Sequence, residues 1–456
     1  IESKKEIVTK ATSYEDLLDE ISEFRDEGKC NENLLELYNY YKNSEEWKNK
    51  LENSITALSY TNEPEKMSEK SIDRLYGDTL KTSISKLEQY KSCPFSYYLK
   101  YGLQLSEKNE LKIEAVDTGT FMHDVIDEFF DIIEQKGINV KQITDEEIKQ
   151  IVDEIVEQKL QLKQNYIFTS IPKYRVLAVR LKKVILKSMR YIVDSLKYSK
   201  FEVLAHELEF KNGKEYEPIV FELDNNKKIE ITGKIDRIDI AKTSDGNYIR
   251  IIDYKSSIKD INLNEVVAGL QLQLLTYLDA VCDINDFLPA GVLYFNLIDQ
   301  SVKANSRISD EQIEAEIKKQ FKMKGLILAD VEVAKMMDTN LESGSSNIIP
   351  AYVDKEGNLS SKSNAVTRKQ FESLQKYTKK IIKQISREIL SGNIDIKPYY
   401  KVKGGKTPCD YCSYKTICNF NSGICKNSYY YIGNINKEAI LEEISKEDKW
   451  KIYQMK

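Results

Sequence analysis

The chain has 456 residues, of which 31% are charged, and a formal net charge of −5. A chain of this length can bury a large core and can hold two or more structural units. Glycine and proline are sparse, which favours a helix-rich α/β protein, and the nearly balanced charge excludes a uniformly basic nucleic-acid-binding polypeptide.

The sequence shows no apolar run long enough to span a bilayer and no signal peptide. We therefore expect no membrane partner and a cytoplasmic location. The first residue is Ile1 rather than Met, as in a fragment or a processed chain.

The N-terminal part predicts a polar, helical segment without recognisable chemistry. Helical patterns cover residues 13–24 and 32–51, and residues 60–82 read as a linker followed by a short helix. The expected domain organisation is a helical unit, a large domain and a C-terminal tail, over residues 1–80, 81–425 and 426–456.

A helix with an aromatic-rich stripe is predicted from residue 85 to about 101. Such a stripe is more often core than a ligand-binding surface. Further helical patterns cover residues 117–136, 144–163, 173–198, 263–283, 309–323 and 364–392. The helix over 173–198 carries many Lys and Arg residues, and a solvated face explains them at least as well as a DNA-tracking face.

Strand patterns dominate the middle of the chain. They cover residues 201–210, 217–223, 227–240, 248–255 and 290–298, whereas 339–363 reads as a loop. Strands that are followed by a helix and another strand predict an α/β fold with a mixed sheet flanked by helices.

Two neighbouring strands carry the most informative residues. Residues 231–240 read ITGKIDRIDI, and after a turn residues 249–257 read IRIIDYKSS. Asp253 and Lys255 project together, because residues i and i+2 of a strand share a face, and a hairpin can bring Asp236 beside them. This arrangement suits a divalent metal that activates water next to a phosphate. A simple Asp–Lys ion pair at a strand end explains Asp253 and Lys255 about equally well.

Other polar residues are candidates for the same site. Glu207 and Glu209 share one face of an earlier strand, and His123 lies on the helix over 117–136, where a packed or surface role is more usual. Gln273 and Tyr277 share a helix face at i and i+4. A buried glutamine needs polar partners, although Gln273 also fits the rim of a helix.

Together these features resemble the RecB-like branch of the PD-(D/E)xK nucleases. That family combines a helix with a His, a strand with an acidic residue, a G-x-x-D-R strand, a D-x-K strand and a Q-x-x-x-Y helix. The matching positions here are His123, Glu207, Gly233 to Arg237, Asp253 to Lys255, and Gln273 to Tyr277. The resemblance implies a restriction-endonuclease-like mixed central sheet flanked by helices.

The same resemblance implies roles for these residues. Mg²⁺ or Mn²⁺ would be held by His123, Glu207, Asp236 and Asp253. Lys255 would orient the attacking water or stabilise negative charge that develops on the phosphate, with Gln273 and Tyr277 completing the catalytic set.

The seven cysteines argue against a disulfide framework, because their number is odd and no secretion signal is present. Cys409, Cys412 and Cys418 form C-x₂-C-x₅-C, a spacing typical of metal binding, and Cys425 follows. The spacing leaves zinc and an iron–sulfur cluster both open.

A further resemblance concerns the nuclease domain of AddB-type helicase–nuclease subunits. It rests on Cys93 in SISKLEQYKSCP, which has the spacing L-x-x-Y-x-x-C-P, followed far along the chain by the C-x₂-C-x₅-C motif. It implies a [4Fe–4S] cluster on Cys93, Cys409, Cys412 and Cys418, with Cys425 a bystander. Such a cluster would staple the C-terminus to the start of the domain and close a loop of about 315 residues, which stabilises the fold.

No motor motif is visible. The nearest approach to a Walker A motif ends at Gly405-Lys406-Thr407, but Tyr400 stands where the first glycine belongs. We therefore expect no ATP hydrolysis by this chain.

The sequence thus predicts a Mg²⁺-dependent DNA nuclease, the subunit of a helicase–nuclease complex that processes double-strand breaks for recombination. The resemblance implies an AddA-type partner in a heterodimer, single-stranded DNA as substrate, and cleavage of the 5′-terminated strand. The alternatives are a stand-alone Cas4-like exonuclease, a DNA-binding or assembly scaffold with a silent site, and a domain stapled by zinc.

Overall fold

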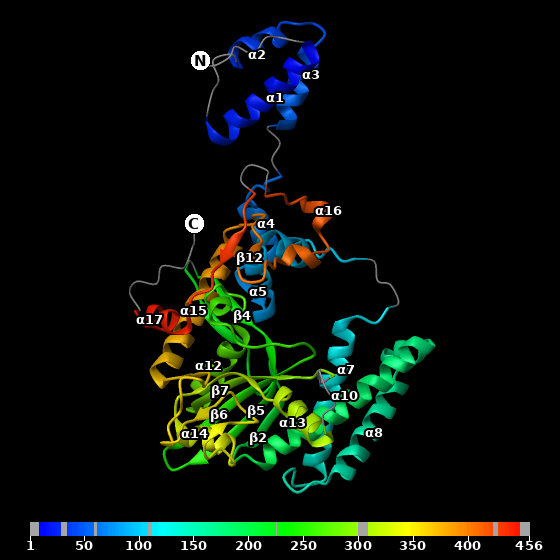
Figure 1. Cartoon of the computed structure of the whole chain (residues 1–456), viewed down its shortest axis with the longest axis vertical. Helices are drawn as coiled ribbons and strands as arrows, with labels where there is room; N and C mark the ends of the chain where they lie inside the picture. The colour runs from blue at the N-terminus through cyan, green and yellow to red at the C-terminus, as the bar shows by residue number, and fades with distance from the viewer. Residues whose placement is uncertain are drawn as a thin grey trace.

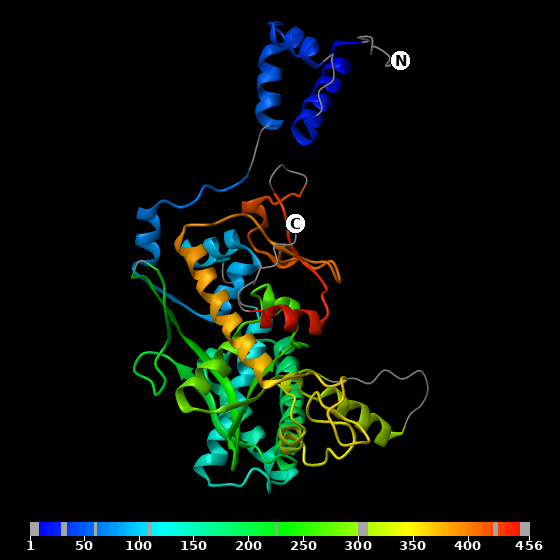
Figure 2. The same ribbon diagram turned by 90° about the vertical axis from the view of Figure 1, so that its left-hand side faces the viewer.

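The computed structural model describes residues 9–28, 34–58, 62–107, 112–224, 226–299, 309–422 and 427–446. Figures 1 and 2 show a small helical bundle at the N-terminus, set apart from a larger α/β body. Among the described residues, no helix combines the length and the apolar character that crossing a membrane requires.

The bundle comprises α1 (Lys10–Glu27), α2 (Leu34–Lys42) and α3 (Lys48–Leu58). It has its own apolar cluster, formed by Tyr14, Leu17, Leu34, Tyr41 and Leu51. The prediction of one helix over 32–51 is wrong. The chain turns between α2 and α3 so that Trp47 can pack against Tyr14 and Tyr41, with ring centroids 5.0 and 5.5 Å away.

The larger body begins before residue 81. Helix α4 (Glu69–Tyr76) leads into β1 (Thr79–Thr82), which pairs in parallel with β4 (Lys228–Ile231). Strand β3 (Ile219–Glu222) completes this three-stranded sheet on the other side of β4. The predicted boundary between residues 80 and 81 therefore falls inside a strand.

The central sheet has six strands in the order β11-β8-β7-β6-β5-β2. The strands are β2 (Glu202–Phe210), β5 (Gly233–Thr243), β6 (Gly246–Lys255), β7 (Leu288–Asn296), β8 (Lys324–Leu328) and β11 (Ala365–Val366). The β6–β7 and β8–β11 pairs are parallel and the other three are antiparallel, so the predicted mixed sheet is confirmed. The single strand predicted over 227–240 is two strands, β4 and β5, which belong to different sheets.

Two groups of helices flank this sheet (Figure 1). One group packs through α7 against β2, and the other packs through α12 against β6 and β7. The groups comprise α7 (Ala115–Gln135), α8 (Asp145–Gln161) and α10 (Pro172–Lys197), and α12 (Gln273–Asn285) and α15 (Arg368–Leu390).

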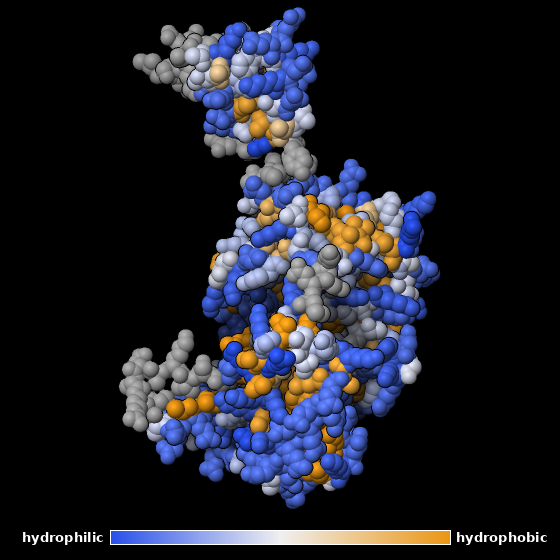
Figure 3. Space-filling model, turned by 90° about the vertical axis from the view of Figure 1, so that its right-hand side faces the viewer, coloured by the Kyte–Doolittle hydropathy of each residue, from blue (hydrophilic) through white to orange (hydrophobic). Residues whose placement is uncertain are grey.

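The basic helix α10 pairs with its neighbour α8. Lys182 lies 3.0 Å from Asp153, and Arg190 lies 3.4 Å from Asp145. Figure 3 shows hydrophilic residues over most of the lower part of this side of the molecule. Lys182 and Arg190 are therefore explained by ion pairs on a solvated helix face, without a role in tracking DNA.

Two predicted helices are interrupted. The helix expected over 85–101 stops at Cys93, whose backbone is extended (φ −170°, ψ 116°) because the residue before a proline avoids the helical region. The helix expected over 263–283 is broken between α11 (Leu263–Val267) and α12 by a loop with Gly269 at φ +81°. Both breaks matter for the site described below.

Shorter elements complete the fold. The helical ones are α5 (Ile84–Ser92), α6 (Pro94–Tyr97), a π-helical turn (Tyr98–Gly102), α9 (Ile167–Ser170), α13 (Asp310–Gln320), α14 (Val331–Met337), α16 (Lys415–Cys418), α17 (Lys437–Ser445), and 3₁₀ turns at Lys163–Asn165 and Pro408–Tyr411. The strands are β9 (Gly344–Ser345), β10 (Tyr352–Val353), β12 (Tyr399–Lys401) and β13 (Tyr430–Ile432). Strand β13 pairs with β12 and α17 packs on α15, so the described part of the C-terminal tail joins the body.

Candidate active site

The site forms where β5 and β6 separate. Their pairing ends with Arg237 opposite Ile252. Beyond that pair the carboxylate of Asp236, and not its backbone, contacts β6: it accepts a hydrogen bond of 2.7 Å from the backbone N–H of Tyr254. The backbone of β6 thus fixes the Asp236 carboxylate beside the last residues of that strand.

Asp253 and Lys255 lie next to Asp236, as the strand alternation predicts. The Lys255 ammonium is 2.5 Å from Asp253 Oδ2. Asp253 is buried, and burial together with the charge of Asp236 raises the pKa of its carboxyl to about 6. The Asp253–Lys255 ion pair, which the sequence left as an alternative to a metal site, therefore lies beside Asp236 in the same site.

A group with metal-binding character surrounds Asp236. One ligand atom each from His123, Glu207 and Asp236 lie within 4.8 Å of one another. His123 reaches in from α7, with Nδ1 3.4 Å from Asp236 Oδ2. Burial lowers the pKa of His123, but the hydrogen bond and the charge of Asp236 outweigh this effect and raise it.

Glu207 owes its position to an unusual backbone. It lies between the pairs His206–Arg237 and Leu208–Ile235 of the β2–β5 register and has φ +50°, the left-handed region that non-glycine residues rarely adopt. Its carboxylate pairs with Lys234. Glu209 pairs instead with Lys214, at 3.3 Å, and is outside the group.

Helix α12 adds two of the predicted residues. The amide of Gln273 donates to Asp253 Oδ1 at 3.4 Å. Tyr277 packs parallel to Phe210, with ring centroids 5.8 Å apart, and its ring fills the space beside Gly233. Burial raises the pKa of the Tyr277 hydroxyl, which therefore keeps its proton.

One residue near the site was missed by the sequence analysis. Glu88 Oε1 on α5 accepts hydrogen bonds from the backbone N–H groups of Leu272 (2.7 Å) and Gln273 (3.2 Å). Burial raises the pKa of Glu88 to about 7, against the opposing effects of these hydrogen bonds and of Lys259 and Lys255. The sequence offers no signal for this contact, because the partners are 184 residues apart.

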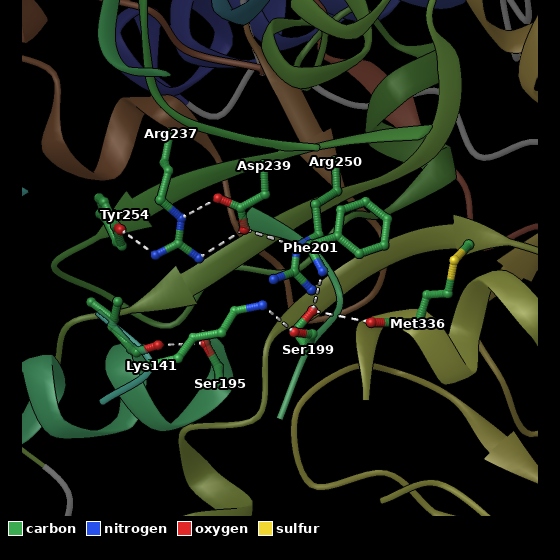
Figure 4. A network of polar contacts seen from close by, with 10 residues as sticks. Lys141, Ser195, Ser199, Phe201, Arg237, Asp239, Arg250, Tyr254 and Met336 are labelled. Atoms are coloured by element: carbon green, nitrogen blue, oxygen red, sulfur yellow. Dashed lines mark hydrogen bonds and ion pairs between the residues drawn. The ribbon is translucent and has the colours of Figure 1, made fainter. Parts of the chain in front are cut away.

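A buried network supports the strands from behind (Figure 4). Arg237 donates to the Tyr254 hydroxyl at 2.8 Å and pairs with Asp239 at 2.9 Å. Arg250 also pairs with Asp239, at 2.9 Å, and lies over the Phe201 ring. Asp239 thus serves two arginines and is not part of the acidic group.

The four predicted cluster ligands meet at a second place. Cys93, Cys409, Cys412 and Cys418 line one cavity of about 1400 Å³. None of the cysteines in the described part of the chain forms a disulfide, and burial raises the pKa of Cys93 to about 12. Cys425 lies outside the described residues. Four thiols around one cavity suit zinc or an iron–sulfur cluster.

Comparison with known proteins gives a family. A family model described as the PD-(D/E)XK nuclease superfamily matches residues 81–419. This match spans the central sheet, the acidic group and the four cysteines.

Curated relatives extend over nearly the whole chain. A protein of Acetivibrio thermocellus is 39% identical over 91% of this chain, one of Clostridium novyi 40% over 90%, and one of Clostridium acetobutylicum 36% over 98%. Each is named as a subunit of an ATP-dependent helicase/deoxyribonuclease. The chain covers 36% of the first two proteins and 39% of the third.

Proposed function

This chain belongs to the PD-(D/E)XK nuclease superfamily, and from that premise we propose that it is a Mg²⁺-dependent deoxyribonuclease. The observation that carries the proposal is the meeting of Asp236, Asp253 and Lys255 at the open end of the β5–β6 hairpin. Two carboxylates and an ammonium on adjacent strands form a site for cutting phosphodiester bonds with metal assistance.

The donor atoms fit a divalent ion. His123, Glu207 and Asp236 offer one imidazole nitrogen and two carboxylate oxygens within 4.8 Å of one another, and Asp253 lies beside them. We propose these four residues as the ligands of Mg²⁺ or Mn²⁺, both of which accept oxygen ligands. When bound, the ion supplies Lewis-acid chemistry to the scissile phosphate and the attacking water.

Lys255 acts as a cation and not as a base. Burial lowers its pKa, but the charge and hydrogen bond of Asp253 outweigh burial and raise it. A protonated ammonium only donates hydrogen bonds, so Lys255 orients the attacking water or stabilises negative charge on the phosphate.

Gln273 and Tyr277 complete the set on α12. Gln273 holds the Asp253 carboxylate in one orientation through its amide. Tyr277 keeps its proton and remains a hydrogen-bond donor. The roles proposed here are to fix the acidic side chains and to contact the DNA backbone.

The four cysteines are proposed to hold a [4Fe–4S] cluster. Their thiols come from the α5–α6 junction and from the segment that follows β12, and they line one cavity. The cluster would join these two distant segments, which restricts the unfolded chain.

The substrate and the partner are proposed from the relatives. All three are named as a subunit of a helicase/deoxyribonuclease, which disfavours the stand-alone Cas4-like exonuclease. We propose an AddA-type partner that delivers single-stranded DNA, cleavage of the 5′-terminated strand, and a role in processing double-strand breaks. ATP hydrolysis would come from another part of the complex, because the sequence of this chain has no Walker A motif.

The test is a cleavage assay with Mg²⁺ on end-labelled single-stranded DNA, using protein purified without oxygen. Cleavage by the parent and its loss in Asp253→Ala and Lys255→Ala would support the nuclease, and labels at either end report the polarity. A folded parent that does not cut, alone or in the complete complex, would contradict it and leave the scaffold role.

A further inference from the structure

Glu88 stands between two parts of the molecule that the proposed function uses. It lies on α5, five residues before Cys93, and its carboxylate reaches the start of α12. Glu88 is partly buried, so water competes less for its oxygen atoms than at an exposed position. It is neither one of the proposed metal ligands nor one of the proposed cluster ligands.

The start of α12 depends on this carboxylate. Within the described part of the chain α12 has no side-chain cap of its own, because its N-cap position is Leu272. The first N–H groups of a helix lack partners inside the helix. Glu88 supplies the missing acceptor for Leu272 and Gln273, at 2.7 and 3.2 Å.

The loop before α12 is fitted to α5 as well. Gly269 adopts φ +81°, and a Cβ at this position would lie 2.9 Å from Lys91 Cγ on α5. Helix α5 therefore fixes both the approach and the first turn of α12. That first turn carries Gln273, which donates to Asp253.

We infer that Glu88 is a positioning residue of the cleavage site, which holds the start of α12 so that Gln273 reaches Asp253. This inference rests on the proposed nuclease function. Glu88 is not a member of the metal-binding group, so it acts through Gln273. Misplacing groups that support a metal site commonly lowers activity about 10- to 100-fold.

The test compares Glu88→Ala, Glu88→Gln and Glu88→Asp in the complete complex. We expect Glu88→Ala to lower kcat about 10- to 100-fold and to leave KM for single-stranded DNA within about twofold. Glu88→Gln keeps an acceptor but loses the charge, and we expect about a tenfold loss. Glu88→Asp keeps the charge and should recover part of kcat.

Asp330→Ala is the matched control. Asp330, the N-cap residue of α14, likewise accepts from two N–H groups at the start of a helix, those of Glu332 and Val333 at 2.9 and 3.2 Å, and that helix is not part of the site. Its removal should leave kcat within about twofold. Glu88→Ala with parental kcat in a folded protein would overturn the inference.

Hydrogen exchange gives a readout that does not need activity. In Glu88→Ala the amides at the start of α12 should exchange faster than in the parent, and those of α14 should not change. If neither the parent nor the complex cuts DNA, the proposed nuclease function is wrong. Hydrogen exchange then decides whether Glu88 holds the start of α12. Unchanged exchange over residues 270–277 would overturn the inference, and faster exchange there would support the role of Glu88 in holding α12.

Discussion

The ring of Tyr277 occupies the space that a side chain at position 233 would need. A Cβ built on Gly233 overlaps the Tyr277 hydroxyl and lies 2.7 Å from Cζ. Glycine at this position thus lets α12 approach β5, with Tyr277 against the strand that carries Asp236. Close approach of another element is a common reason for glycine inside a strand.

Gly233→Ala should therefore damage both the fold and the site. We expect the free energy of unfolding to fall by about 1–3 kcal/mol, as overpacking does, and cleavage to fall with it because Tyr277 must move. Urea unfolding measures the first effect. The same substitution in a Tyr277→Ala background should cost less, and purely additive costs would show that the two residues do not share this space.

The buried carboxylate of Asp239 should matter greatly for stability. Asp239→Ala leaves Arg237 and Arg250 buried without their shared partner, and such a loss costs about 3–5 kcal/mol. Asp299→Ala is the matched control, because Asp299 forms an exposed pair with Arg180 at 3.0 Å and should cost less than about 1 kcal/mol. Equal costs by urea unfolding would contradict the role of the network.

Metal binding should distinguish two neighbouring glutamates. Glu207→Gln removes one carboxylate from the group that surrounds Asp236, and we expect affinity for Mn²⁺ to fall at least about tenfold in calorimetric titration. Glu209→Gln on the same strand should leave it unchanged, because Glu209 pairs with Lys214. The reverse result would show that Glu209, and not Glu207, binds the metal.

The stability of Glu88→Gln relative to the parent should depend on pH. The pKa of Glu88 is raised from 4.5 to about 7 in the folded chain, so folding favours the protonated form. The parent therefore loses stability as pH rises from about 4.5 through 7, whereas the glutamine variant has no proton to lose. We expect the free energy of unfolding of the variant, relative to that of the parent, to rise by about 1–3 kcal/mol between low pH and pH values above 7.

Urea unfolding of both proteins at several pH values measures this difference. The proteins should converge near pH 5 and separate near pH 8. A constant difference across this range would contradict the raised pKa. A variant that is more stable yet cuts DNA more slowly would separate the positioning role of Glu88 from a purely structural one.

The four-cysteine cavity should hold iron. We expect protein purified without oxygen to show broad visible absorbance and about four iron atoms per chain, and Cys93→Ser to lose both. Cys282→Ser is the matched control, because Cys282 is a free thiol that does not line the cavity. Stoichiometric zinc in place of iron would support the zinc-stapled alternative.

The local parts of the site could be predicted from the sequence because they obey short-range rules. Asp253 and Lys255 share a face through strand alternation, and the short turn after β5 brings Asp236 to them. The choice of Glu207 over Glu209 depended on the family resemblance. Its backbone at φ +50° leaves no periodic pattern in the sequence.

Contacts between distant segments could not be predicted in this way. Strand β1 pairs with β4, which lies about 150 residues away in the sequence. The sequence of neither strand indicates that the other is its partner. The contact of Glu88 with α12 is of the same kind. The break at Cys93 has a local signal, because Pro94 follows it, whereas the break at Trp47 is set by the packing of the bundle.

The chain order of the two sites has a consequence for biosynthesis. The β5–β6 hairpin ends at Lys255 and can form as soon as that residue has left the ribosome. The cavity of the four cysteines cannot close until Cys418 has also emerged, although Cys93 appears early. Domains fold as they are synthesised, so the sheet can assemble before Cys409, Cys412 and Cys418 are available beside Cys93. Loading of the proposed cluster would therefore be a late step in the maturation of this chain.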